Sequence, residues 1–204
     1  MSRQVVLSRP GPVRFEIEPI LRSRFIGIAE MTSTEDAAQR LLADVRAEFP
    51  DASHHCSAWR IASPSIDRCS DDGEPSGSAG RPMLAQLQGR DLVNTAVVVV
   101  RWFGGTKLGV GGLVRAYGAS AAAVLDSVGT VPWRQMVTAT ITHGYPDTDT
   151  VDRVLTEHGI VAGHVNYGAE VVRSIEVAVD DTVDLTAAII DATAARALVE
   201  IDDD

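Results

Sequence analysis

The stretch that decides the fold is residues 101–118, which read RWFGGTKLGVGGLVRAYG. It continues an apolar run, residues 95–102, that predicts a buried strand, and it leads into a helix expected to begin at Gly111 or Gly112. A strand, a glycine-rich turn and a helix N-terminus in this order leave backbone N–H groups free to bind an anion. The segment therefore predicts both a strand-to-helix turn and a candidate binding loop.

Three cations accompany this loop: Lys107, which is the only lysine of the chain, and the flanking Arg101 and Arg115. Lys107 follows Thr106, which is the reverse of the order in a Walker phosphate loop, and the glycine spacing does not give GxGxxG. The loop suits an anionic ligand or an RNA backbone. Glycines that only permit tight packing would produce the same pattern, so both interpretations remain open.

A second polar stretch, residues 71–82, reads DDGEPSGSAGRP. Its carboxylates Asp71, Asp72 and Glu74 could bind a divalent cation, or one of them could act as a general acid. The glycines and hydroxyls that follow, Ser76 among them, could instead receive an anion at a helix start. A solvated turn with acids that cap the next helix is a third interpretation, and it is the commonest one for such loops.

The strand expected at residues 54–61 begins with two histidines and a cysteine. Strand alternation puts His54 and Cys56 on one face and His55 on the other. Cys69 could add a third zinc-type ligand to His54 and Cys56, but the spacing matches no standard zinc pattern, so we expect no structural metal at this strand and no cofactor. A Cys–His nucleophilic pair and simple packing both remain open.

Composition and charge limit the class of protein. The chain has 204 residues, of which 45% are hydrophobic and 23% charged, as in an ordinary globular protein. The net charge of −10 is uneven: residues 1–132 carry 14 Lys and Arg against 14 Asp and Glu, whereas residues 133–204 carry 4 against 14. Only the first part can therefore approach nucleic acid. With two cysteines, no leader and no run long enough to span a bilayer, we expect a cytoplasmic protein without membrane attachment.

The pattern changes near residue 130, which predicts domains at 1–130 and 131–204. In the first domain we expect a helix from Ser33–Asp36 to Pro50 and a short helix over 81–88, with residues 62–80 forming one long irregular loop. The second domain shows the order β-α-β-β-α-β of a ferredoxin-like fold. The fold class is α+β.

The two long motifs, together with Ser23–Ile26 and His54–Arg60, closely resemble the Impact/YigZ family over about residues 15–125. A weaker resemblance covers residues 135–201. The family implies a first domain with the left-handed β-α-β fold of a small-subunit ribosomal protein and of elongation factor G, followed by a ferredoxin-like domain. Ser57 and Trp59 depart from residues common in the family, but the departures are mild.

Eukaryotic members of this family regulate translation through a partner protein, so the resemblance implies a translation-related role. We expect the first domain to bind RNA, the ribosome or translation factors, and the acidic second domain to contact a protein. The alternatives are an enzyme acting on a phosphate-bearing small molecule or nucleotide, and an interaction module with structural loops. We expect His54, Asp72, Glu74 and Lys107 to approach one cleft. The candidate site is His54, Cys56, Asp71, Asp72, Glu74, Ser76, Arg101, Lys107, Gly111, Gly112 and Arg115.

Overall fold

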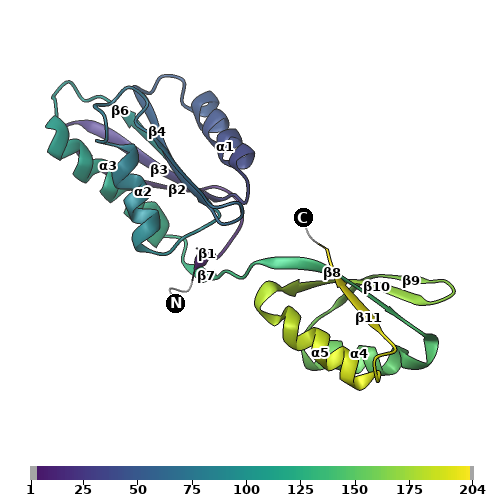
Figure 1. Cartoon of the computed structure of the whole chain (residues 1–204). Coiled ribbons are helices and arrows are strands. Elements are labelled where there is room, and N and C mark those ends of the chain that lie inside the picture. Colours follow the sequence, from purple (N-terminus) through teal and green to yellow (C-terminus); the bar gives the residue numbers. More distant parts are fainter. Residues whose placement is uncertain (1–3, 203–204) are drawn as a thin grey trace. The chain divides into compact units, whose positions relative to one another are not determined.

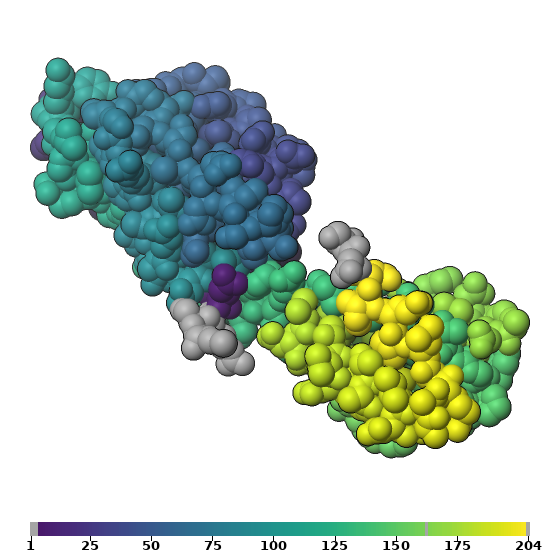
Figure 2. Space-filling model, in the orientation of Figure 1, coloured from purple at the N-terminus to yellow at the C-terminus, as the bar shows by residue number. Residues whose placement is uncertain are grey.

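The computed structural model describes residues 4–202, which form two compact α+β units that meet between Trp133 and Arg134. The boundary lies slightly beyond the expected residue 130, because strand β7 (Thr130–Pro132) pairs with β1 (Val5–Leu7) of the first unit. Figure 2 shows these N-terminal residues against the green segment around residue 130. Backbone pairing therefore extends the first domain by a few residues.

The first domain is built on a five-stranded sheet in which every neighbouring pair is antiparallel. Its order is β2 (Val13–Ile20), β3 (Ser23–Met31), β6 (Thr95–Trp102), β4 (His54–Ile61) and β5 (Ile66–Ser70). Helix α1 (Glu35–Glu48) covers one face, and α2 (Gly80–Gly89) with α3 (Gly109–Asp126) covers the other (Figure 1). Thr34 caps α1 through its side chain, as the sequence predicts.

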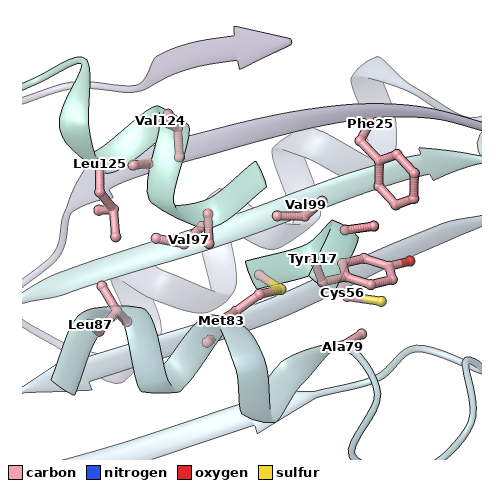
Figure 3. Close-up of a cluster of buried hydrophobic side chains, with 14 of the residues drawn as sticks. Phe25, Cys56, Ala79, Met83, Leu87, Val97, Val99, Tyr117, Val124 and Leu125 are labelled. Atoms are coloured by element: carbon pink, nitrogen blue, oxygen red, sulfur yellow. The ribbon is translucent and has the colours of Figure 1, made fainter. Parts of the chain in front are cut away.

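Strand β6 is buried on both faces, which explains its continuous apolar sequence. Val97 and Val99 pack toward α2 and α3, while Val98 and Val100 pack toward α1. On the first of these faces Tyr117 packs edge-on against Phe25 at 5.5 Å between ring centroids (Figure 3). Burial of side chains of this size contributes about 1.5–3 kcal/mol each, so the two faces of β6 anchor the domain.

Two expectations for the first domain are wrong in detail. Residues 62–80 are not one loop, because Ile66–Ser70 form strand β5 and pair with β4 at the edge of the sheet. The sequence of this stretch is too polar to predict a strand. It becomes one because β4 provides hydrogen-bonding partners along its edge. Helix α3 begins at Gly109, two residues before the expected start.

The second domain confirms the ferredoxin-like expectation. Its elements are β8 (Met136–His143), α4 (Thr148–Glu157), β9 (Ala162–Tyr167), β10 (Val171–Ala178), α5 (Thr182–Ala192) and β11 (Leu198–Ile201). The antiparallel sheet has the order β11-β8-β10-β9, and both helices cover one of its faces (Figure 1). Ile141, Ile175 and Ile189 join sheet and helices in one core. No helix in residues 4–202 is long and apolar enough to cross a membrane.

Candidate functional site

The site is organised by the register of three neighbouring strands. On β3, β6 and β4, Phe25 lies opposite Arg101, and Arg101 lies opposite His54. The next row toward the middle of the sheet is Gly27, Val99 and Cys56, which is buried. Because paired residues share a face, Arg101 and His54 form a polar row at the end of the core that is covered by α2 and α3.

A buried ion pair lies on this row. Arg101 Nη1 donates to Glu74 Oε1 at 2.5 Å, and the Tyr117 hydroxyl donates to the same oxygen at 2.7 Å. The side chains of Arg101 and Glu74 are each only 4% exposed. Burial, together with Cys56 and Glu74 nearby, raises the pKa of Tyr117, so its hydroxyl stays protonated and donates. Glu74 therefore accepts from one charged donor and one neutral donor.

The rest of the Arg101 side chain is bounded by a hydroxyl and two rings. Nη2 donates to Ser23 Oγ at 3.2 Å, and the guanidinium lies 5.5 Å from the ring of Phe25 and 5.6 Å from that of Phe103. Its Nε is buried and has no hydrogen-bond partner within residues 4–202. Arg101 thus keeps one unused donor at the end of the sheet.

His54 is oriented by the acidic loop. Its Nδ1 lies 2.9 Å from the carbonyl oxygen of Asp72, so Nδ1 carries the proton and donates to it. The other ring nitrogen, Nε2, lies 3.7 Å from Glu74 Oε1. The backbone of the acidic loop therefore sets the tautomer of His54.

These groups border a cleft of about 400 Å³, which is within the range of small-ligand pockets. Apolar side chains form most of its walls and Lys107 lines it as an exposed cation. Since Glu74 and Arg101 neutralise one another, Lys107 supplies the net positive charge of the lining. The lining residues are His54, Glu74, Pro75, Arg101, Phe103, Lys107, Leu108, Gly109, Val110 and Leu113.

The glycine-rich loop that leads to the cleft packs closely against the backbone of Arg22 and Ser23. A Cβ on Gly104 would lie 2.0 Å from the carbonyl carbon of Arg22, so only glycine fits there. Gly109 has a φ of +68°, the left-handed region that favours glycine, where α3 begins. Packing and backbone conformation thus account for two of the glycines that the sequence presents as a binding loop.

Asp71 does not face the cleft; its carboxylate accepts backbone N–H groups at the start of α2. The donors are Gly77 at 2.7 Å, Gly80 at 2.8 Å and Ala79 at 2.9 Å. Burial opposes ionisation of Asp71, but the three hydrogen bonds outweigh it and lower its pKa. The capping interpretation is the one that the structure supports for this residue.

Asp72 is the clearest departure from the expected cleft. Its carboxylate accepts from the backbone N–H of His55 and from Arg46 Nη2 of α1, both at 2.6 Å. Its side chain therefore joins the loop to α1 and β4, and it is not part of the cleft lining. A φ of +43° turns the chain between Asp72 and Glu74, so neighbouring acids diverge. The described residues hold no cluster of three or more His, Cys, Asp or Glu suited to a metal ion.

Cys56 is buried beneath the polar row, where its thiol donates to the carbonyl of Asp71 at 3.0 Å. Figure 3 shows it next to Tyr117. Burial and the carboxylates nearby raise its pKa to about 12, against an opposing hydrogen bond with Tyr117. A thiol with this pKa is a poor nucleophile at neutral pH, so the geometry does not support a Cys–His pair.

The structure thus brings together His54, Glu74, Arg101 and Lys107 from the predicted set. Ser76 is exposed and does not line the cleft, and neither do Gly111, Gly112 and Arg115, which lie in the first two turns of α3. Residues that the sequence interpretation missed are Ser23, Pro75, Phe103, Leu108, Gly109, Val110, Leu113 and Tyr117. For Leu113 and Tyr117 the spacing of four on a helix is a usable signal, because it puts both on one face.

Comparison with known proteins gives matches to both domains. Residues 21–125 match the Impact N-terminal domain, and residues 141–196 match a domain of unknown function (DUF1949). A solved crystal structure of a hypothetical protein superposes with a TM-score of 0.70 at 32% identity, covering 100% of this chain and 99% of that one. The two-domain architecture therefore recurs as a whole.

Three curated relatives carry the family name. IMPACT family member YigZ of Escherichia coli is 50% identical over 105 residues, which cover 50% of this chain and about half, 52%, of that protein. IMPACT family member YvyE of Bacillus subtilis is 39% identical over 153 residues, covering 74% and 70% of the two chains. Protein IMPACT homolog of Saccharomyces cerevisiae is 38% identical over 86 residues, 40% of this chain and 33% of that protein. The chain belongs to the IMPACT family.

Proposed function

We propose that this chain is a translation-related binding protein whose first domain binds RNA at the surface around the cleft. The observation that carries the proposal is the exposed Lys107 beside the N-terminus of α3, next to the half-exposed ring of Phe103. A cation supplies attraction for a phosphate, and an exposed aromatic ring supplies a stacking platform for a base. The family resemblance supplies the link to translation.

The charge distribution supports a local site over a broad one. Lys107 and Arg115 are exposed, and neither side chain makes an ion pair or hydrogen bond with another described residue. Their charge is therefore available to a ligand, although residues 1–132 are neutral overall. The excess of ten acidic residues in 133–204 repels a phosphate backbone, so we assign RNA contact to the first domain. We expect the acidic second domain to contact a protein partner through a basic surface of that partner.

The test is RNA affinity of the full chain at several salt concentrations between about 50 and 200 mM. Lys107→Gln should weaken binding and lower the salt slope by about one, because one phosphate contact is lost. Arg40→Gln is the matched control, since Arg40 is an exposed cation on α1, which covers the other face of the sheet. No affinity for RNA, or equal effects of the two variants, would contradict the proposal.

A second candidate function is an enzyme acting on a phosphate-bearing small molecule or nucleotide. His54 favours it, because its Nε2 lies 3.7 Å from the buried Glu74 carboxylate in the cleft lining, and paired imidazole and carboxylate groups can carry out general acid–base catalysis. Turnover of a panel of nucleotides and sugar phosphates by the wild type, abolished in His54→Gln, would select this function. Binding without turnover would leave the RNA-binding proposal.

A further inference from the structure

Gly111 is a glycine that the protein itself does not require. Its φ is not in the left-handed region, and a Cβ placed on it would meet only Arg115 Nη1 at 3.7 Å, an ordinary contact. Glycine inside a helix is less favourable than alanine. Gly104, in contrast, is required by a backbone contact. The missing side chain at Gly111 leaves open space over the first turn of α3.

This first turn also lacks the usual partners of a helix N-terminus. α3 runs for 18 residues, and its N-cap, Leu108, makes no side-chain hydrogen bond to it. The first turn contains no acidic residue, and the cation Lys107 directly precedes the N-cap. Uncapped N–H groups, the positive end of a helix and a lysine together favour an anion such as a phosphate.

An independent observation lies at Arg101 in the same cleft. The side chain is 96% buried, yet its Nε has no hydrogen-bond partner within the described residues. Both hydrogen bonds to Glu74 end on Oε1, and no described residue donates to Oε2. A buried donor without a partner destabilises the fold, and a ligand acceptor would recover that loss. The buried pair thus offers one donor and one acceptor to a ligand in the cleft.

The walls near these polar groups are apolar and partly exposed. Phe103 is 49% exposed and Val110 57% exposed, and both line the cleft with Leu108 and Leu113. A flat polar ring such as a nucleobase carries an apolar face and an edge of donors and acceptors, which matches these walls and the Arg101–Glu74 pair. Lys107 and the first residues of α3, Gly109 and Val110, belong to the same lining.

We infer that the cleft is a subsite for one nucleotide. The phosphate binds at Lys107 and the first turn of α3, and the base lies against the apolar wall with its edge toward Arg101 Nε and Glu74. The inference rests on the proposed function for the source of the nucleotide, which is then one unit of a single-stranded RNA. A free nucleoside monophosphate presents the same chemistry.

The first experiment measures binding of inorganic phosphate, a panel of nucleosides and the matching nucleoside 5′-monophosphates to the full chain by calorimetry. We expect at least one monophosphate to bind at least tenfold more tightly than its nucleoside and than phosphate alone. Gly111 lies beside the cleft, on the same first turn of α3 as the lining residues Gly109 and Val110, so Gly111→Leu adds a bulky side chain next to the phosphate position and should lower that affinity at least tenfold. Ala119→Leu, at an exposed position further along the same helix, is the matched control and should change nothing.

Lys107→Gln is the second variant, because an exposed loop residue keeps the fold intact should Gly111→Leu perturb α3. A second measurement compares RNA with the same strand in which successive positions lack the base. Loss of affinity at one abasic position supports the subsite. RNA binding without any abasic effect, and without monophosphate binding, overturns the subsite and leaves the proposed function standing. Monophosphate binding without RNA binding supports the subsite and overturns the RNA proposal.

Discussion

Two buried arginines, one in each domain, show how differently the same side chain is used. Arg101 lies on the central strand β6, and Arg173 lies on β10, an inner strand of the second sheet. Arg173 Nε donates to His143 Nε2 at 3.0 Å, and its Nη1 pairs with Asp152. Arg101 Nε has no partner among the described residues and its side chain borders the cleft. An arginine whose Nε has a hydrogen-bond partner, such as Arg173, stabilises the core of its domain. An arginine whose Nε has none, beside a cleft, leaves a donor for a ligand.

The partners of the two arginines also differ in exposure. Glu74 is 4% exposed, whereas Asp152 is 52% exposed and keeps much of its hydration. Loss of the arginine would leave a buried charge in the first domain and a solvated one in the second. The comparison therefore predicts unequal costs for the same substitution in the two domains.

The largest effect is expected for Arg101→Met. It leaves the Glu74 carboxylate buried without its cation, which costs about 3–5 kcal/mol of unfolding free energy. Urea unfolding followed by tryptophan fluorescence reports this domain, because Trp59, Trp102 and Trp133 all precede Arg134. The double variant Arg101→Met with Glu74→Gln removes the charge and should recover part of the loss. A cost below about 1 kcal/mol would show that the pair is hydrated and would break the comparison.

A smaller effect is expected for Arg173→Met in the second domain. The substitution leaves the buried Nε2 of His143 without its donor, at a cost of about 1–3 kcal/mol, while Asp152 rehydrates. Circular dichroism during thermal unfolding measures it. Asp152→Asn, which keeps Arg173 and leaves it an amide oxygen as acceptor, is the control and should cost less than Arg173→Met. A loss equal to that of Arg101→Met would remove the distinction between the two sites.

Alkaline pH should act on the first domain through Cys56, whose pKa is raised by burial from 9.0 to about 12. Below pH 9 the thiol is neutral in the folded and the unfolded chain. Between pH 9 and 12 it ionises only when unfolded, so stability falls as pH rises, by up to about 1.4 kcal/mol per pH unit.

Urea unfolding at pH 8, 9 and 10 measures this slope. Cys56→Ala should make it shallower, and Cys69→Ala, which removes an exposed thiol, should change it less. The second domain contains no cysteine and provides an internal reference. Equal slopes in the wild type and in Cys56→Ala would contradict the buried-thiol assignment.

The smallest effect concerns surface cations. Lys107→Gln should change the unfolding free energy by less than about 0.5 kcal/mol, because an exposed loop side chain without an ion pair loses little. Arg153→Gln, which breaks an exposed pair with Glu157 on α4, should be similarly small. Only the first of the two variants should reduce phosphate affinity. A large stability loss in Lys107→Gln would assign the lysine a structural role.

Much of the fold could be predicted from local patterns. The apolar run from Thr95 to Trp102 predicts a strand buried on both faces, and Thr34 followed by acids predicts the start of α1. The charge difference along the chain coincides with the domain division near Trp133. These features depend on residues that are close in the sequence or on composition, so they can be predicted without knowing which distant segments pack against them.

Strand β5 and the site depended on the tertiary structure. Ile66–Ser70 become a strand only because β4 offers its edge, and Asp71, Asp72 and Glu74 look alike in the sequence. Packing gives the three acids separate tasks: a helix cap, a partner for Arg46 and a buried partner for Arg101. Burial and hydrogen-bond partners come from segments far apart in the chain, so no local pattern can determine which carboxylate reaches the cleft.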